Sequence, residues 1–256
     1  SCGAETWRAL AGSGRGGGEL VSGAMHLDEL PERSQDYLKH IYDLEEWAGT
    51  RGVGLSALAE AMGQRRSTTS EAVKRLAGGG LVEHAPYADV KLTEQGRGFA
   101  IQLVRRHRLI ETFLVRELGY GVEEVHDEAE VLEHAVSDLF IARVDERLGR
   151  PDRDPHGDPI PDASGRLAPV DDVVLSEAAP GQRVRVSRLR DRDEEFLRHM
   201  TAQGVLPGAE LRVEERPYPQ LARFSVLSAP EGHEPPGGPV DIPAGALGEI
   251  QVELLS

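Results

Sequence analysis

The order of predicted elements between residues 34 and 93 constrains the fold of this chain more than any other feature of its sequence. Five segments follow one another: helices over 34–48, 55–62 and 67–77, then strands over 81–84 and 89–93. Ser34 and Ser67 stand where helix caps are expected, and Pro86 lies in the turn between the strands. Helix, short helix, turn, helix and hairpin together predict a winged helix-turn-helix.

The charge of the chain is unevenly distributed. Its net charge of −15 by itself disfavours a nucleic-acid partner. Residues 51–108, however, contain ten Lys or Arg and only five Asp or Glu, so this segment carries +5 and the rest of the chain −20. A basic module inside an acidic protein is typical of local phosphate binding, although charge alone leaves an uneven surface as an equal alternative.

Two long helices are predicted after the hairpin. The first runs from about Thr93 to Leu118 and ends before Gly119, and the second runs from about Glu123 to Leu148. The apolar stripe of the second helix comprises residues 125, 129, 132, 136, 139, 140 and 144. Such a stripe is long enough to serve both a core and a dimer interface.

Short strands predict a separate β domain at the C-terminal end. Six prolines in residues 151–180 mark a loop and linker. Alternation of apolar and polar residues then returns in four segments: 183–186, 210–213, 224–227 and 247–252. With a helix over 193–203, this spacing favours a small SH3-like barrel. The predicted fold class is mainly α with a small β part.

The helix over 67–77 is the predicted DNA-recognition helix. Hydroxyl groups at its start can donate to phosphates, and a helix N-terminus favours anions. The candidate contact residues are Arg65, Arg66, Ser67, Thr68, Ser70, Glu71 and Lys91. Glu71 could accept from a cytosine amino group or simply face solvent. Ser67 alone is better explained as a helix cap, so the prediction depends on the whole unit.

Carboxylates and an imidazole meet on one face of the second long helix. Glu130, Glu133 and His134 lie at i, i+3 and i+4. Two carboxylates beside an imidazole form half of a divalent-cation site, although exposed Glu/His faces are common without one. A further ligand is expected from elsewhere, and Asp36 in the first helix is the natural candidate.

A second group of the same residue types strengthens the metal interpretation. The first long helix carries His107 and Glu111 at i, i+4, and His126 lies one turn before Glu130. Clustering on two consecutive helices makes a metal centre as plausible as a solvated polar face.

Five segments together resemble the diphtheria toxin repressor / manganese transport regulator family of metal-dependent transcriptional repressors. They are residues 34–42 (SQDYLKHIY), 64–76, 106–111 (RHRLIE), 126–134 (HDEAEVLEH) and 155–161 (PHGDPIP). The resemblance covers about residues 33–256. It implies a homodimer of winged-helix subunits, each with a helical metal-binding and dimerisation domain and a C-terminal SH3-like (FeoA-like) domain.

The same resemblance implies two metal sites. The residues that match its activating, or primary, site are Asp36, Glu130, Glu133 and His134. The residues that match its second, ancillary site are His107, Glu111 and His126. The C-terminal domain usually completes the second site, and Asp191 and Glu195 are the choices here, with Asp193 a close rival.

The ligand types indicate manganese. Iron-sensing relatives place Met and Cys where this chain has Asp36 and Glu130, and oxygen donors suit hard Mn(II) better than sulfur does. Fe(II) remains the first competitor, and Co(II) or Zn(II) could bind in vitro. Lys39 stands where some manganese sensors have a Glu that supports a paired-metal site, which argues for two separated sites. Asp154 and Asp158 replace small polar residues that help hold an anion in some relatives, which argues against an anion here.

The predicted protein is a Mn(II)-dependent regulator that binds double-stranded operator DNA as a homodimer and represses metal-uptake genes. The expected divisions are a disordered tail (1–32), the DNA-binding domain (33–98), the metal-binding and dimerisation domain (99–162), a linker (163–180) and the SH3-like domain (181–256). The sequence contains no run of about 18 apolar residues, so a membrane span is not expected. The single cysteine, Cys2, fits a reducing cytoplasm.

Three other functions stay open from the residues alone. An iron-dependent repressor of the same family is the first. A metal-independent winged-helix regulator with an organic effector is the second, and retained operator binding in a chelator would favour it. An enzyme that hydrolyses phosphate esters is disfavoured, because the sequence shows no nucleophile elbow or phosphate-binding loop.

Overall fold

The computed structural model describes residues 26–85, 88–169, 171–230 and 232–255. The chain divides into two units, Ser1–Leu30 and Pro31–Ser256. The described end of the first unit contains a 3-10 helix, η1 (Leu27–Glu29). Residues 1–25 of the predicted tail, with Cys2, lie outside the described residues, as does Pro86 in the predicted turn, whereas Glu32 at the end of the predicted tail already lies in the first α-helix.

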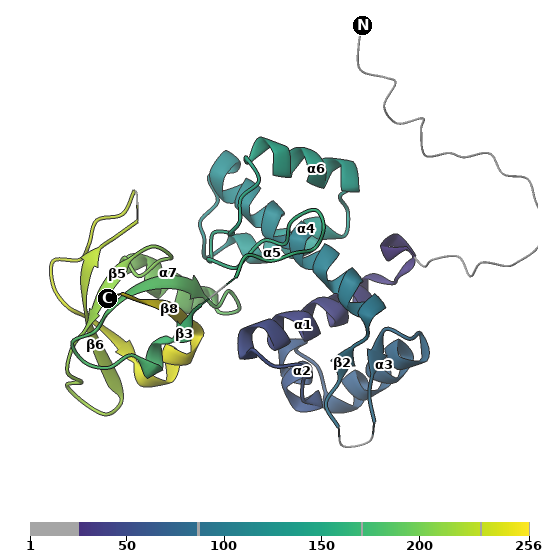
Figure 1. Cartoon of the computed structure of the whole chain (residues 1–256), viewed down its shortest axis with the longest axis horizontal. Helices are drawn as coiled ribbons and strands as arrows, with labels where there is room; N and C mark the ends of the chain where they lie inside the picture. The colour runs from purple at the N-terminus through teal and green to yellow at the C-terminus, as the bar shows by residue number, and fades with distance from the viewer. Residues whose placement is uncertain (1–25, 86–87, 170, 231, 256) are drawn as a thin grey trace, which may run out of the picture. The chain divides into compact units, whose positions relative to one another are not determined.

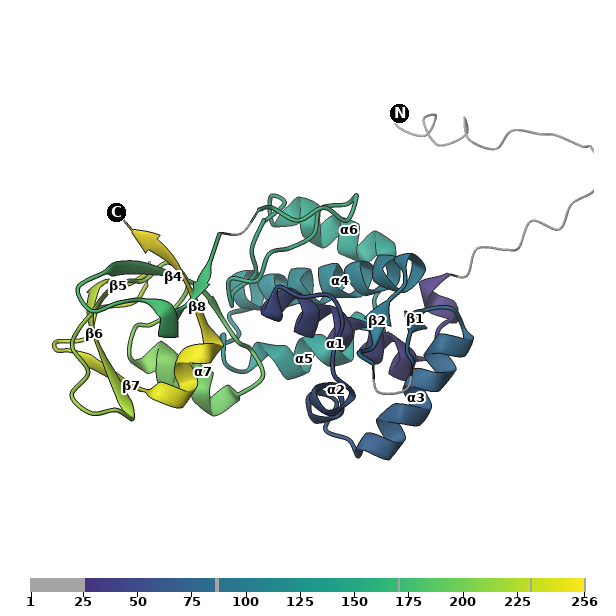
Figure 2. The same cartoon turned by 60° about the horizontal axis from the view of Figure 1, so that its bottom comes forward.

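The second unit begins with the winged helix-turn-helix that the sequence predicts. Its elements are α1 (Glu32–Ala48), α2 (Leu55–Ala61), α3 (Arg66–Gly78), β1 (Val82–Glu83) and β2 (Lys91–Leu92). The two strands are antiparallel, with Val82 opposite Leu92, and Figure 2 shows this wing beside α3. Leu38, Leu58 and Val73 form its fully buried core, one from each helix.

Two predicted helix caps are wrong. Helix α1 begins two residues before Ser34, with Pro31 at the N-cap position. Helix α3 begins at Arg66, so Ser67 lies inside its first turn and Arg65 is the N-cap residue. Serine is so often a cap that its presence near a helix start misplaces the boundary. The consequence is useful: the hydroxyl of Ser67 is not needed to cap α3.

Three helices form the next part of the unit: α4 (Glu94–Leu118), α5 (Val125–Glu133) and α6 (Asp138–Arg147). Figure 1 shows α5 and α6 against α4, and both pack on it. The single helix predicted over 123–148 is therefore wrong. Ser137 accepts from the backbone N–H of Phe140 and starts α6 as a separate helix. Among the described residues, no helix has both the length and the apolar character to cross a membrane.

The start of α4 is packed directly on the wing. Thr93 caps the helix by accepting from the backbone N–H of Gly96 at 3.0 Å. The Thr93 hydroxyl in turn donates to the carbonyl oxygen of Gly80 at 2.8 Å. A Cβ atom at Gly96 would lie only 1.9 Å from the carbonyl oxygen of Leu81. Glycine is therefore required where α4 meets the chain entering the wing.

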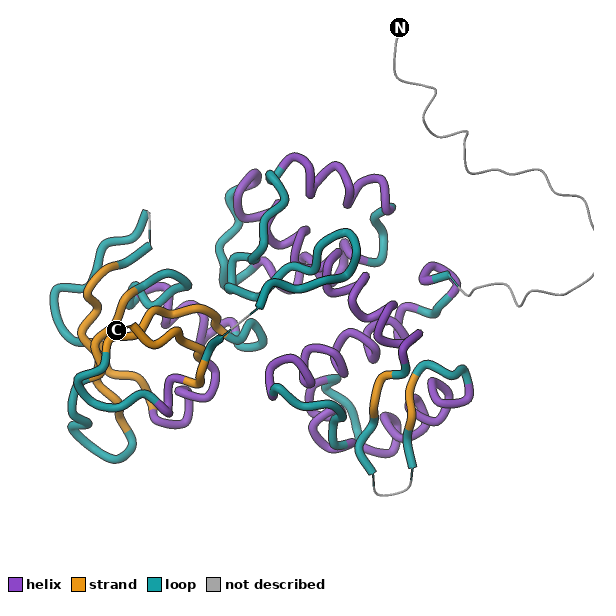
Figure 3. The backbone as a smooth tube through the Cα atoms, viewed as in Figure 1, coloured by secondary structure: helices purple, strands orange, loops and turns teal. Residues whose placement is uncertain are grey.

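A six-stranded antiparallel sheet forms the C-terminal part, in the order β3-β8-β4-β5-β6-β7. Its strands are β3 (Val173–Val174), β4 (Arg183–Leu189), β5 (Glu210–Val213), β6 (Leu221–Ser228), β7 (Val240–Pro243) and β8 (Ile250–Leu255). Helix α7 (Glu194–Ala202) follows β4, and its Leu197 and Met200 are fully buried in the core of this SH3-like domain. Figure 3 shows strands in the wing and in this domain, with helices predominating elsewhere.

Part of the predicted linker belongs to this sheet. Strand β3 and the 3-10 helix η2 (Leu175–Glu177) lie within 163–180, and β3 pairs with β8. The sequence analysis also missed β7, and it placed the last strand too early because Ala244–Glu249 forms a 3-10 helix, η3. Two-residue and four-residue strands are too short to show an alternating pattern.

The SH3-like domain is attached to the end of α1 through two arginines. The guanidinium groups of Arg188 and Arg190 each lie 5.0 Å from the centre of the Trp47 ring. Arg188 also forms ion pairs with Glu46, at 3.0 Å, and with Asp158. Stacked and ion-paired arginines of this kind make a stronger contact than isolated surface pairs.

Candidate metal centre and nucleic-acid interface

Helix α3 and the wing present the predicted DNA-contact residues. The exposed ones are Arg65, Arg66, Ser67, Thr68, Glu71 and Lys91, and Ser70 is half-buried. Thr69 differs from its neighbours, because it is fully buried and donates to the carbonyl oxygen of Arg65. Glu71 forms an exposed ion pair with Lys74 at 2.8 Å, so its carboxylate already has a partner in the absence of DNA. The arginines and the small hydroxyl groups remain available to phosphates and base edges.

The first group of potential metal ligands joins α1 to the end of α5. Asp36, Glu133 and His134 each offer a donor atom, and these atoms lie within 4.8 Å of one another. Nε2 of His134 is 2.9 Å from Oδ1 of Asp36 and 3.6 Å from Oε1 of Glu133. Its Nδ1 faces the amide oxygen of Gln35 at 3.2 Å, which orients the ring with Nε2 toward the carboxylates.

Lys39 occupies the space between the two glutamates of the predicted primary site. Its ammonium group lies 2.5 Å from Glu130 and 2.6 Å from Glu133, and the side chain is almost fully buried. Glu130 is therefore grouped with Glu133 and His107 instead of with Asp36. Lys39 also offsets the mutual repulsion of the carboxylates, because its ammonium group pairs with two of them.

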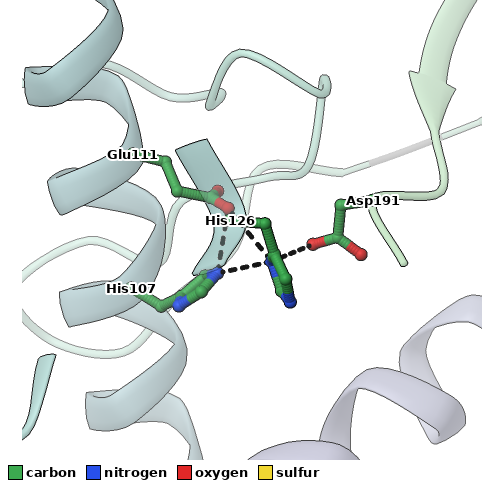
Figure 4. A group of neighbouring side chains, drawn as sticks. All are labelled: His107, Glu111, His126 and Asp191. Atoms are coloured by element: carbon green, nitrogen blue, oxygen red, sulfur yellow. Dashed lines mark hydrogen bonds and ion pairs between the residues drawn. The ribbon is translucent and has the colours of Figure 1, made fainter. Parts of the chain in front are cut away.

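The second group brings together residues from two helices and the segment after β4. Figure 4 shows His107 and Glu111 on α4, His126 on α5 and Asp191 beyond the strand. His107 Nε2 lies 2.9 Å from Oε1 of Glu111 and 3.2 Å from Nδ1 of His126. Asp191 Oδ2 lies 3.3 Å from Nδ1 of His126. Two imidazoles and two carboxylates with converging donor atoms suit a divalent transition metal.

Of the two C-terminal residues predicted to complete this group, the structure brings in only one. Asp191 is a member, but Glu195 is exposed on α7 and belongs to none of the potential ligand groups in the described ranges. The rival, Asp193, is the N-cap of α7 and accepts from the backbone N–H of Phe196 at 3.0 Å. The segment 191–195 contains four acidic residues, and they cannot be told apart without the path of the chain after β4.

His107 connects the two groups. Its Nδ1 lies 2.6 Å from Oε2 of Glu133, while its Nε2 faces the second group. A carboxylate can only accept, so Nδ1 carries the hydrogen and Nε2 is the nitrogen that a metal could use. Burial tends to raise the pKa of Glu133, but Lys39 and His107 outweigh it and lower this pKa to about 2.

The imidazoles of the second group hold protons tightly. Burial alone would lower the pKa of His107, but the carboxylates of Glu111 and Glu133 outweigh it and raise this pKa to about 9. Burial opposes the charge of His126 in the same way, yet Asp191 and Glu111 raise its pKa to about 11. Both rings are thus protonated at neutral pH, and a metal ion would have to displace those protons.

Binding of Mn(II) is therefore expected to release about two protons from these imidazoles near neutral pH. Because both pKa values lie above 7, the apparent affinity should rise as the pH increases, by up to about 100-fold per pH unit. Calorimetric titration in buffers of different ionisation enthalpy measures the proton count. An Asp36→Asn variant serves as the control, because it leaves these imidazoles intact. An affinity independent of pH between 6 and 8 would contradict the expectation.

The loop formed by residues 154–158 contributes ionisable residues that the sequence analysis did not assign to a site. His156 is fully buried, and its backbone oxygen accepts from the N–H of Leu189 in β4 at 2.8 Å. Gly157 has φ +89°, and a Cβ atom there would lie 1.9 Å from the carbonyl oxygen of Ser187. The sequence feature that could have pointed to this loop is His156-Gly157 between two prolines, because glycine between prolines is typical of a tight turn that packs closely against its neighbours.

Arg108 could supply the positive charge for a bound anion, but carboxylates already surround its guanidinium group. Its guanidinium group is 2.7 Å from Glu46 and 2.6 Å from the carbonyl oxygen of Pro159. Asp43 lies 3.5 Å away and Asp154 lies 3.9 Å away. These carboxylates already balance the charge of Arg108, and the absence of an exogenous anion stays a prediction.

Three sequence profiles match most of the described chain. The iron dependent repressor N-terminal DNA binding domain matches residues 29–90. The iron dependent repressor metal binding and dimerisation domain matches residues 93–162. A FeoA domain matches residues 173–222, which begins at β3 and so agrees with the observed extent of the sheet.

Curated relatives include two kinds of repressor. The iron-dependent repressor IdeR of Mycobacterium tuberculosis is 36% identical over 204 residues, covering 75% of this chain and 87% of the relative. The diphtheria toxin repressor of Corynebacterium glutamicum is 33% identical over 198 residues, covering 73% of this chain and 86% of the relative.

Solved structures with the same fold include manganese regulators. A manganese-dependent transcriptional repressor in complex with manganese has 44% identity and a TM-score of 0.78, and the match covers 87% of this chain and all of that one. The manganese regulator SloR has 32% identity and a TM-score of 0.70, with 87% and 98% covered.

Proposed function

Because the chain belongs to the diphtheria toxin repressor family of metal-dependent transcriptional repressors, which are DNA-binding proteins and not enzymes, we propose that Mn(II) is its activating metal. The observation that carries the proposal is the donor chemistry of the two ligand groups. Both consist only of carboxylate oxygen and imidazole nitrogen atoms, in a fold that joins α1 to α5 through Asp36. Oxygen-rich sites of this kind suit Mn(II), which is a hard cation.

The mechanism follows from which elements supply the ligands. Asp36 belongs to the DNA-binding head, whereas Glu133 and His134 belong to the helical domain. A bound divalent ion supplies the positive charge that holds these three donors together. The residues then fix the angle between the head and the helical domain. In a dimer, this angle decides whether two copies of α3 reach successive major grooves, about 34 Å apart.

In the metal-free protein, Lys39 competes with a metal ion for the carboxylates of Glu130 and Glu133. With Glu130 and Glu133 paired to its ammonium group, the neighbour of Asp36 among the described residues is the imidazole of His134, at 2.9 Å. We infer that Glu130 joins the primary site only when it exchanges Lys39 for the metal. The four-residue primary site predicted from the sequence is therefore retained as a proposal for the metal-loaded state.

The test is operator binding with the metal under control. With an operator selected from a random DNA pool, Mn(II) should increase the affinity of the unmodified protein by about 100-fold. Asp36→Asn should abolish this increase while the protein stays folded, because Asp36 is half-buried and carries no helix cap. Glu128→Gln, an exposed change on α5, should leave the response intact. Equal affinity with metal and with chelator would contradict the proposal.

Iron is the alternative with a specific observation in its favour, since IdeR is an iron-dependent repressor at 36% identity. Buffered Mn(II), Fe(II) and Zn(II) in the same assay separate these cases, with Co(II) as an additional probe. Asp36→Met adds a soft ligand and should shift the response toward Fe(II). A response to Fe(II) alone in the unmodified protein would replace manganese with iron as the activating metal.

We infer that the active form is a homodimer, in the cytoplasm where operator DNA lies. Helices α5 and α6 present Val131 and Leu139, which are 69% and 68% exposed, together with Phe140. Large apolar side chains that stay exposed mark an interaction surface, and residues 93–162 match a dimerisation domain. Leu139→Glu is therefore expected to convert the dimer to a monomer in light scattering. An exposed control, Glu128→Gln, should leave the mass unchanged, and a dimeric Leu139→Glu protein would contradict this assignment.

A further inference from the structure

A third group of potential ligands lies on the far side of Glu111 from the second group. Glu111, Asp154 and His156 each offer one donor atom, and these three atoms lie within 4.8 Å of one another. The exposed fractions of the three residues are 0%, 7% and 0%, so the group is buried. A buried ionisable cluster is costly unless its members are hydrogen-bonded, paired or bound to a metal.

The atoms that face one another have no hydrogen-bond partner. They are Oε2 of Glu111, Oδ2 of Asp154 and Nδ1 of His156. The other oxygen of Asp154 accepts from the backbone N–H groups of His156 and Asp158, at 2.9 and 2.8 Å. The loop therefore fixes this carboxylate so that its free oxygen points into the group.

The orientation of His156 settles which nitrogen is free. Its Nε2 lies 2.8 Å from the carbonyl oxygen of Val122, which can only accept, so Nε2 carries the hydrogen. Burial opposes the charge of His156, but Glu111 and Asp154 outweigh it and raise its pKa to about 10. At neutral pH Nδ1, which lies 3.5 Å from Oε2 of Glu111, therefore carries a proton that a metal ion would have to displace. A lone pair facing two carboxylate oxygens in a buried space requires either a proton or a cation between them.

The arginine beside this group is Arg108, whose Nε lies 3.9 Å from Oδ2 of Asp154. Its guanidinium group is already held by Glu46 and by the carbonyl oxygen of Pro159. Two carboxylate oxygens would also repel an anion. Two oxygens and one imidazole nitrogen are, however, the donor types that a divalent transition metal takes.

We propose that Glu111, Asp154 and His156 form a third divalent-metal site, and that Glu111 bridges it to the second site. The proposal rests on the proposed function, because the other oxygen of Glu111 faces His107 and His126 in the second group. A carboxylate shared between two metals places them about 3.5–4 Å apart. The pair would tie the 154–158 loop, and with it β4, to helix α4.

The test is the number and position of manganese ions in the full chain. The unmodified protein, equilibrated with Mn(II) alone, should bind three ions per chain. Asp154→Asn keeps the oxygen that accepts the two backbone N–H groups and removes the free one, so it should bind two. Asp36→Asn should also bind two, through loss of the ion at the primary site instead.

Anomalous diffraction at the manganese edge locates the ions without any variant. Two peaks on either side of Glu111 and a third beside Asp36 are expected. Peaks at the first and second groups with none between Glu111 and Asp154 would overturn the third site and leave the proposed function intact. A pair at Glu111 with no ion near Asp36 would support the third site while contradicting the proposed activation. In the unmodified protein, magnetic coupling between two Mn(II) ions gives an independent spectroscopic signature, and its loss in Asp154→Asn is expected.

Discussion

Replacing Lys39 with methionine is expected to destabilise the metal-free protein by about 3–5 kcal/mol. The ammonium group of Lys39 is the counter-charge of both Glu130 and Glu133, and only 2% of the residue is exposed. Methionine fills nearly the same volume but leaves the two carboxylates without that partner. Removing one member of a buried ion cluster costs far more than the cluster itself contributes.

Mn(II) is expected to reverse most of this loss. In the variant no ammonium group competes for Glu130 and Glu133, so the affinity for the ion should increase. At 100 times the dissociation constant, a bound ligand stabilises the folded state by about 2.7 kcal/mol. Denaturant unfolding with chelator and with excess Mn(II) measures both effects in one experiment.

A matched control is available on the surface. Lys74 forms an ion pair with Glu71 in which both side chains are 64% exposed. Lys74→Met should change the free energy of unfolding by less than about 1 kcal/mol, with or without metal. If Lys39→Met proved no more harmful than Lys74→Met, the two glutamates would not depend on the buried ammonium group.

Alanine at Gly96 is expected to destabilise the protein by about 3 kcal/mol, whereas alanine at Gly98 should stabilise it by up to about 1 kcal/mol. The two positions lie two residues apart in α4. At Gly96 the new Cβ atom would be 1.9 Å from the carbonyl oxygen of Leu81, which belongs to the backbone and cannot rotate away. At Gly98 no atom lies within 4 Å of that position, so only the helix propensity changes.

Thermal unfolding distinguishes the two variants, because in a chain of this size a change of 1 kcal/mol in the free energy of unfolding shifts the unfolding midpoint by about 2–4 °C. The two variants should shift the midpoint in opposite directions. Shifts of the same sign and size would show that α4 does not press on the wing. Operator binding by the folded fraction of Gly96→Ala would also weaken, since the wing carrying Lys91 is displaced.

Several elements could be predicted because their signals are local. Thr93 and Gly119 bracket α4 as cap and stop, and the structure places both ends there. Spacings of three and four residues put Glu130 beside Glu133 and His107 beside Glu111. Local periodicity determines such neighbours whatever the rest of the fold.

The remaining features depend on contacts between distant segments. The apolar period of 123–148 continues through the break at 134–137 because α5 and α6 both pack on α4. Leu139, counted in that stripe, is exposed on the surface proposed for dimerisation. Glu195 and Asp191 differ only in how the chain leaves β4, and no local pattern reports that path. The position of Lys39 between two glutamates of another helix is likewise a tertiary fact.

Contacts near the two ends of helix α1 come from different parts of the chain. Near its start, Asp36 meets His134, and near its end, Glu46 and Trp47 meet Arg188. Ten residues of helix separate Asp36 from Glu46, or about 15 Å. Contacts at both ends restrict the direction of α1 more than a contact at one end. We therefore expect the contact with Arg188 to hold the end of α1 while metal binding at Asp36 adjusts its start.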